Sequence, residues 1–336
     1  MSEVVIVGGG PAGLNCAYHL AKAGKDVILI ERNTFPVDKL CAGGLTVKDF
    51  HEGIPKDIVE RTFARHIIHT PLGKTIFKTL KPSVFTVNRK TLSMWLFERA
   101  IKAGVKIEKG KVVKININAV ITKDGRQYNY HYLVGADGSF SVVRRYLRIP
   151  IRHFLLAWQT SIPFSLKEIE WFLDASSFSS GYGWIFPYKK NAVVGFVCPD
   201  PKDTPKAKIR FLHWLKKTHG LIIDRPFKAH LINTDYRGCH FGRIYLAGDA
   251  AGFASGLTGE GIYFALASGR SIAQMILSGK NSLTPLNKPL VIKHRHEQTA
   301  QMLSFLPRFL LKGTFECFRK SLKMPFLGKI ILKWYG

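Results

Sequence analysis

The chain has 336 residues, of which 46% are hydrophobic and 22% are charged, and its mean hydropathy is +0.02. This length and balance predict a globular protein of about two domains and exclude a disordered, collagen-like or coiled-coil chain. The charge is unusual, because 50 Lys and Arg stand against 23 Asp and Glu and give a net charge of +27. Such an excess predicts an anionic partner: a nucleic acid, an anionic membrane or a phosphorylated substrate.

The sequence also predicts where the protein works. No stretch reaches the roughly 18 apolar residues that a membrane span needs, and the apolar start at residues 4–7 lacks the basic region of a signal peptide. The five cysteines form no Cys-x-x-Cys pair, which favours a reducing compartment and argues against a disulfide framework or a zinc ribbon. His66 and His69 have no evident third ligand, so we expect no metal site. We expect a cytoplasmic protein, either free or bound peripherally to the inner face of the membrane.

The first 31 residues predict a strand–helix–strand unit. Residues 4–7 and 27–30 are short apolar runs typical of buried strands, and residues 14–23 between them have helical spacing and end at Gly24. Further along, residues 89–103 predict a helix that Gly104 ends, and residues 105–107, 112–117 and 128–134 predict strands.

After Pro150 the pattern becomes strand-rich. Strands are predicted at 153–162, 169–173, 183–186, 192–197 and 230–232, with a basic helix at 206–217. A strand at 244–247 and a helix after Thr258 indicate a return to the first domain. We therefore predict an α/β protein with an α+β second domain. Its Rossmann-like nucleotide-binding domain (1–150 and 235–285) is interrupted by an antiparallel-sheet substrate domain (151–234, with part of 60–90), and a basic helical segment follows (286–336).

Gly8-x-Gly10-x-x-Gly13 follows the first predicted strand and opens the first helix, and Glu31 ends the second strand. In this context the glycines allow a tight turn, close approach of a pyrophosphate and close packing of helix on strand. Glu31 can accept hydrogen bonds from a ribose. The candidate dinucleotide-binding residues are Gly8, Gly10, Ala12, Gly13, Glu31 and Arg32.

Two further segments indicate which dinucleotide the protein binds. Residues 132–138 are a strand that runs into Asp137-Gly138, and residues 243–252 are a strand that ends in Gly248-Asp249 at a helix start. An Asp at such a turn can hold a ribityl hydroxyl, and the helix N-terminus can stabilise negative charge on a reduced flavin. In this order and spacing, the segments resemble the FAD-binding fold of the p-hydroxybenzoate hydroxylase superfamily. The resemblance places Arg89 near the FAD phosphates and makes Asp137, Gly248 and Asp249 cofactor-binding candidates.

Within that superfamily the chain resembles the geranylgeranyl reductase family. Residues 39–44 (Lys-Leu-Cys-Ala-Gly-Gly) are similar to its Cys-Gly-Gly loop, residues 182–187 match its Tyr-x-Trp-x-Phe-Pro element, and residues 256–262 are similar to its Gly-rich stretch. The resemblance covers about residues 1–280, although Gly-Phe-Val at 195–197 replaces the family's Gly-x-Gly. It implies catalytic roles for Cys41, Gly43 and Gly44, cofactor contacts for Cys41, Ala42, Gly259, Gly261 and Ile262, and substrate contacts for Tyr182, Trp184, Phe186 and Pro187.

The residues leave alternatives open. Tyr182, Trp184 and Phe186 alternate along a strand and so share one face, which either lines an apolar slot or forms sheet core. Cys41 either touches the flavin and protonates a product carbon or is an inert buried thiol.

The resemblance implies an FAD-dependent oxidoreductase that reduces carbon–carbon double bonds of an isoprenoid chain, by hydride transfer from reduced flavin N5. The substrate would be a geranylgeranyl lipid, a prenyl diphosphate or a quinone tail. The electrons would come from NADPH or from a ferredoxin, an acidic partner that suits the basic surface. An FAD-dependent monooxygenase of the same superfamily is the alternative. A nucleic-acid-binding protein is the third reading, although no helix-turn-helix, zinc or RNA-recognition motif supports it.

The last 49 residues carry ten Lys and Arg against two Glu, interleaved with large apolar residues. This pattern is typical of helices that lie on an anionic membrane surface, and equally of helices that cover another domain with a solvated basic face.

Overall fold

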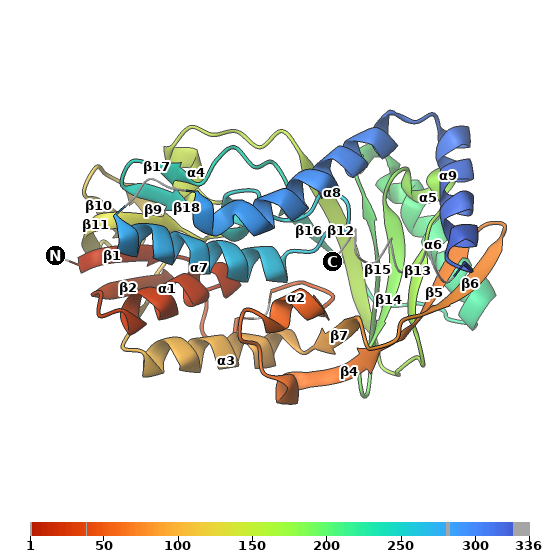
Figure 1. Ribbon diagram of the computed structural model, residues 1–336, viewed down its shortest axis with the longest axis horizontal. Coiled ribbons are helices and arrows are strands. Elements are labelled where there is room, and N and C mark those ends of the chain that lie inside the picture. Colours follow the sequence, from red (N-terminus) through yellow and green to blue (C-terminus); the bar gives the residue numbers. More distant parts are fainter. Residues whose placement is uncertain (1, 38, 280–282, 325–336) are drawn as a thin grey trace.

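The computed structural model describes residues 2–37, 39–279 and 283–324. Figure 1 shows two main layers: a first sheet with its helices at the N-terminal end of the view and a second sheet at the opposite end. Helix α8 runs along the top between them, and α9 stands at the outer edge of the second sheet. The predicted fold class is confirmed by this arrangement.

The first sheet has the strand order β17-β18-β11-β1-β2-β8, and its central pairs are parallel. Strand β1 lies in the middle with its Val and Ile side chains fully buried, as expected of a strand covered on both faces. Its elements are β1 (Ser2–Val7), α1 (Pro11–Lys22), β2 (Val27–Glu31), α3 (Arg89–Lys102), β8 (Lys106–Lys109), β9 (Val112–Ile115), β10 (Ala119–Thr122), β11 (Gln127–Gly135), α4 (Val142–Tyr146), β17 (His240–Phe241), β18 (Ile244–Leu246) and α7 (Ile262–Ser278).

Helices α1 and α7 lie in unusually close contact beside this sheet. A Cβ atom at Gly269 of α7 would lie 2.3 Å from the carbonyl oxygen of Ala12 in α1, so only glycine permits the approach. The contact brings the start of α1 next to the middle of α7, although about 250 residues separate them.

The second sheet has the order β16-β12-β15-β14-β13-β5-β6. It was predicted to be antiparallel, and it is so except that β5 and β13 are parallel. The exception arises because β5 and β6 come from residues 65–78, before the rest of the sheet. Its elements are β5 (Arg65–Thr70), β6 (Gly73–Lys78), β12 (Phe154–Ile162), β13 (Ile169–Phe172), α5 (Ala175–Phe178), β14 (Tyr182–Pro187), β15 (Ala192–Cys198), α6 (Thr204–His219) and β16 (Lys228–Asn233).

The predicted basic helix is present as α6, whose inner side buries Phe211, Trp214 and Leu215 against one face of the second sheet. The opposite face of the sheet is left for the site described below. A small third sheet joins the two layers and consists of β3 (Gly44–Thr46), β4 (Val59–Phe63) and β7 (Val84–Val87), with α2 (Val47–Phe50) after β3. The predicted domain boundaries stay predictions.

The C-terminal segment forms α8 (Asn287–Phe305) and α9 (Arg308–Ser321). Both helices pack inward, since Lys293 and His296 of α8 and Leu311 and Phe315 of α9 are buried. Part of the predicted basic helical segment lies outside the described residues, including its last large apolar residues Phe326, Leu327, Ile330, Ile331 and Trp334. In the described ranges, every helix is too short or too polar to cross a bilayer.

Arg144 holds together two of the places where the chain crosses between the sheets. Its guanidinium, 2% exposed, donates to the carbonyl oxygens of Pro150 at 2.9 Å and Asp235 at 2.9 Å, and to that of Ala250 at 3.3 Å. The Asp235 carboxylate lies 3.6 Å away. Pro150 lies on the outgoing crossing and Asp235 on the return, so a single side chain holds both.

We expect Arg144→Met to lower the free energy of unfolding by about 3–5 kcal/mol, because it leaves several buried carbonyl oxygens without their donor and removes a buried cation from beside the Asp235 carboxylate. Urea unfolding followed by tryptophan fluorescence measures the change. The exposed neighbour Arg145 is the matched control, and Arg145→Met is expected to change stability by less than about 0.5 kcal/mol. Equal stability of the two variants would contradict the stabilising role of Arg144 at the two crossings.

Candidate functional site

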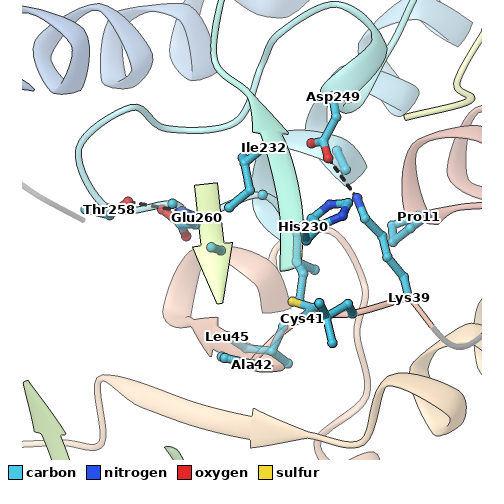
Figure 2. Close-up of a pocket in the computed structure, with 18 of the residues that line it drawn as sticks. Pro11, Lys39, Cys41, Ala42, Leu45, His230, Ile232, Asp249, Thr258 and Glu260 are labelled. Atoms are coloured by element: carbon cyan, nitrogen blue, oxygen red, sulfur yellow. Dashed lines mark hydrogen bonds and ion pairs between the residues drawn. The ribbon is translucent and has the colours of Figure 1, made fainter. Parts of the chain in front are cut away.

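A cavity of about 1170 Å³ lies between the two sheets and is lined by residues from both. It exceeds the roughly 300–1,000 Å³ of ordinary small-molecule sites, as a site for a dinucleotide and a second ligand should. Figure 2 shows part of its wall, where Lys39, Cys41, His230 and Asp249 converge from separate segments. All predicted site residues except Gly13, Gly43 and Pro187 line it.

The glycine turn before α1 has the geometry that its sequence predicts. Gly8 has a φ of +106°, and a Cβ there would lie 2.4 Å from the Ala136 carbonyl oxygen. A Cβ at Gly13 would lie 2.0 Å from the Gly8 carbonyl oxygen, whereas one at Gly10 would meet nothing within 4 Å. Gly10 therefore faces open space at the N-terminus of α1, where no side chain caps the helix. Free backbone N–H groups at such an end suit a phosphate group.

Glu31 lies at the end of β2 and is buried. Its carboxylate accepts hydrogen bonds from the backbone N–H of Gly9 at 2.6 Å and of Asn33 at 2.8 Å. These bonds fix the carboxylate against the glycine turn, where it lines the cavity together with the exposed Arg32. Ala12, in the first turn of α1, lines the same wall.

Arg89 begins α3 and is 8% exposed. Its Nε and Nη1 atoms are buried and have no hydrogen-bond partner in the protein. A buried guanidinium with free donors that lines a cavity is a fitted site for an anion. Asp137 also lines the cavity, and one of its oxygens accepts from the Val142 N–H at 2.6 Å. Burial raises the pKa of Asp137, against the opposing effect of its hydrogen bonds to Ser141 and Val142.

Asp249 forms an ion pair with Lys39 in the cavity wall, with 2.7 Å between the Lys39 Nζ and a carboxylate oxygen (Figure 2). Burial alone raises the pKa of Asp249, but Lys39, His230 and Arg89 together hold it below its ordinary value. Burial and then Lys39 lower the pKa of His230 to about 4, against the opposing charge of Asp249. Asp249 is therefore ionised and His230 neutral at pH 7, and the His230 Nε2 has no partner in the protein.

The start of α7 completes this wall. Gly248 has a φ of +56°, and a Cβ there would lie 3.0 Å from that of Ala12. Gly259, Gly261 and Ile262 line the cavity, and Gly261 caps α7 without a side chain. The N-terminus of a second helix thus lines the cavity, in addition to that of α1.

The loop that contains Cys41 is held against β14. The Tyr188 hydroxyl donates to the Ala42 carbonyl oxygen at 2.6 Å. Gly43 has a φ of +67° and would place a Cβ 2.1 Å from that hydroxyl, and a Cβ at Gly44 would lie 2.4 Å from the Phe186 ring. Both glycines are therefore packing requirements of the loop. The Cys41 thiol, half-buried, faces the cavity and accepts from the Gly43 N–H at 3.4 Å.

Strand β14 directs its three aromatic side chains into the cavity. Tyr182, Trp184 and Phe186 line the wall, and the Tyr182 hydroxyl donates to the Thr258 carbonyl oxygen. Trp184 and Phe186 are 5% and 7% exposed and also belong to a buried cluster. The two alternatives from the sequence are therefore compatible, since these rings are both sheet core and cavity wall. Pro187 ends the strand, and its carbonyl accepts from Thr86.

Sequence reasoning missed several residues of this wall. His230 and Tyr188 belong to no motif, and Lys39 lies within the 39–44 stretch but had no role predicted for it. The pair Asp49 and Glu260 was also missed: the Thr46 hydroxyl lies 3.1 Å from a carboxylate oxygen of each. Burial, and then the charge of Glu260, raise the pKa of Asp49 above its ordinary value, against the opposing hydrogen bonds from Thr46.

Comparison with known proteins indicates which cofactor binds in this cavity. Residues 1–220 match the model of the FAD binding domain family. The chain belongs to this family. It is 33% identical to an uncharacterised protein of Methanosarcina barkeri over 83% of its own length and 76% of that protein. It is 30% identical to the chloroplastic geranylgeranyl diphosphate reductase of Nicotiana tabacum over 82% of its own length and 66% of that enzyme.

Among solved structures, the flavoprotein is similar to a geranylgeranyl bacteriochlorophyll reductase-like protein from Thermoplasma acidophilum, with a TM-score of 0.81 and 21% identity. The match covers 96% of this chain and 91% of the other, and at this identity it supports the fold. The resemblance to the geranylgeranyl reductase family is confirmed, and the protein is an FAD-dependent oxidoreductase. The free guanidinium of Arg89, the open space at Gly10 and the two uncapped helix starts fit FAD. The roles of individual residues stay predictions.

We expect Arg89→Met to weaken FAD binding about tenfold to a hundredfold, because the variant loses charge-assisted hydrogen bonds of about 1.5–3 kcal/mol. Equilibrium dialysis of the apoprotein against FAD measures the affinity. Lys90→Met, at the exposed neighbouring position, is the control and should bind FAD as the unchanged protein does. An unchanged affinity of Arg89→Met with normal circular dichroism would remove Arg89 from the FAD site.

Proposed function

We propose that this flavoprotein reduces carbon–carbon double bonds in an isoprenoid chain. The observation that carries the proposal is the course of the cavity. It begins at the glycine turn and Arg89, passes the Cys41 loop and the aromatic face of β14, and continues between α9 and β5–β6 along mainly apolar residues. A long apolar chain beside a flavin is the occupant that this shape suits, and the name of the tobacco relative points to the same class.

When bound, FAD in its reduced form supplies a hydride to one alkene carbon. The aromatic residues of β14 hold the chain in position and exclude water. The Cys41 thiol faces the same space and is our candidate for the proton that goes to the other alkene carbon. The bond between Tyr188 and Ala42 fixes the loop and therefore the position of this thiol.

The electrons enter from NADPH or from a ferredoxin in this proposal. Within the whole sequence only one Gly-x-Gly-x-x-Gly unit follows a strand and opens a helix, so a nicotinamide would bind transiently at the flavin. The charge of +27 favours an acidic protein donor. Anaerobic bleaching of the flavin absorbance by NADPH, compared with bleaching by reduced ferredoxin, separates the two donors.

The proposal predicts that dithionite-reduced enzyme is reoxidised under anaerobic conditions by a geranylgeranyl lipid or a prenylated quinone. Recovery of the oxidised flavin absorbance and a product heavier by one hydrogen molecule per reduced double bond are the measurements. The alternative activity, an FAD-dependent monooxygenase, predicts substrate-stimulated oxygen consumption and a hydroxylated product. That result, or no reoxidation by any prenyl acceptor, would overturn the proposal.

Replacement of Cys41 tests the proton transfer. We expect Cys41→Ala to slow the anaerobic reoxidation by at least about tenfold and to leave the flavin content unchanged, because a positioned general acid typically contributes about 10²–10⁴-fold. Cys317→Ala, at an exposed position on α9, is the matched control and should react as the unchanged enzyme does. Equal rates in the two variants would mean that Cys41 is an inert thiol.

A further inference from the structure

The corner where α8 meets α9 exposes large apolar side chains. Met302 is 58% exposed, Phe305 78%, Phe309 73% and Leu310 47%. Figure 1 places this corner at the outer edge of the molecule, away from α1 and α3. These four residues lie within nine positions of the chain, unlike the scattered single apolar residues of an ordinary surface. We call these four residues the apolar corner.

The apolar corner cannot turn inward, because the opposite side of α9 is fixed to the second sheet. Leu311 and Phe315 are buried there. Glu316 accepts from the Thr70 hydroxyl at 2.7 Å, and Arg319 donates to the Thr75 hydroxyl at 2.9 Å. These bonds fix which face of α9 points outward.

The cavity reaches the same corner. Its far end is lined by Thr299, Met302 and Leu303 of α8 and by Phe315 and Phe318 of α9. Met302 is at once a residue of the cavity wall and 58% exposed, so the cavity opens to the surface at the apolar corner.

The charge around the apolar corner is positive. Helices α8 and α9 contain seven Lys and Arg against two Glu. Both carboxylates form ion pairs within their own helix, Glu297 with Lys293 and Glu316 with Arg319. Lys312 is exposed on α9 two residues after Leu310 of the apolar corner, whereas Arg308 is paired with Asp203. Exposed aromatic and aliphatic groups with flanking cations are the composition of a surface that binds anionic lipid headgroups.

We propose that the apolar corner docks onto an anionic bilayer, with its side chains in the headgroup layer and Lys312 against the lipid phosphates. In this position the cavity opening at Met302 faces the membrane, so that an isoprenoid chain passes from the bilayer into the cavity. This second step rests on the proposed function, whereas the docking itself does not. An acidic protein would match the charge, but it would not account for an apolar opening beside it.

Flotation with lipid vesicles tests the docking. The full-length flavoprotein should float with vesicles of phosphatidylcholine and phosphatidylglycerol, and binding should weaken with salt and on pure phosphatidylcholine. We expect Phe305→Ser combined with Phe309→Ser to weaken binding at least about tenfold. Ile117→Ser is the control: this residue is 73% exposed and lies between β9 and β10, at the opposite end of the molecule in Figure 1.

Three results would overturn the docking: no flotation of the unchanged protein, equal flotation of the double variant, or a dimer in size-exclusion chromatography that the double variant abolishes. The last result would make the apolar corner an interface between two copies. Reoxidation by detergent-dispersed substrate separates the two proposals. The double variant should still be reoxidised by detergent-dispersed substrate but no longer by substrate in vesicles. If the unchanged enzyme is reoxidised by neither form of the substrate, the proposed function is refuted and the flotation result is unaffected.

Discussion

The arrangement of the two sheets depends on one buried guanidinium. The chain leaves the first sheet after α4 and returns after β16, and Arg144 binds backbone carbonyls on both crossings. The cavity lies between the sheets, so its width depends on how these crossings are held. Arg144 is positioned in turn by the Ser141 side chain, which accepts from its backbone N–H at 2.9 Å. The segment after Asp137 therefore serves the architecture as well as the cofactor.

Around this frame, the site is assembled from segments that are far apart in the sequence. The start of α1, the Cys41 loop, Arg89 and the start of α7 all reach one cavity wall. Electrostatics divides that wall into zones. Free N–H groups and Arg89 suit phosphates, the Lys39–Asp249 pair provides polar partners, and the face of β14 is aromatic and largely buried. Such a gradient suits a cofactor and a substrate that are each polar at one end.

The sequence predicted those parts of the site whose chemistry is local. The spacing of Gly8, Gly10 and Gly13 is enough to predict the turn that they form. The alternation of Tyr182, Trp184 and Phe186 is likewise enough to predict that they share one face of a strand. Lys39 and His230 could not be found in this way, because a lysine or histidine becomes part of a site only when another segment is placed beside it. The same limit applied to the fold: part of residues 60–90 was predicted to join the second sheet, but the parallel pairing of β5 with β13 depends on contacts across about 100 residues.

The position of α9 has a consequence for the order in which the protein can acquire its shape. Phe315, Phe318 and Leu322 form part of the cavity wall, about 300 residues after the glycine turn that begins it. The ribosome makes about 5–20 residues per second, so the first strands and helices have many seconds to form before this wall exists. The cavity can close only once residue 322 has left the ribosome. During synthesis the apolar residues of β5 and β6 that line this part of the cavity therefore stay uncovered until α9 folds against them.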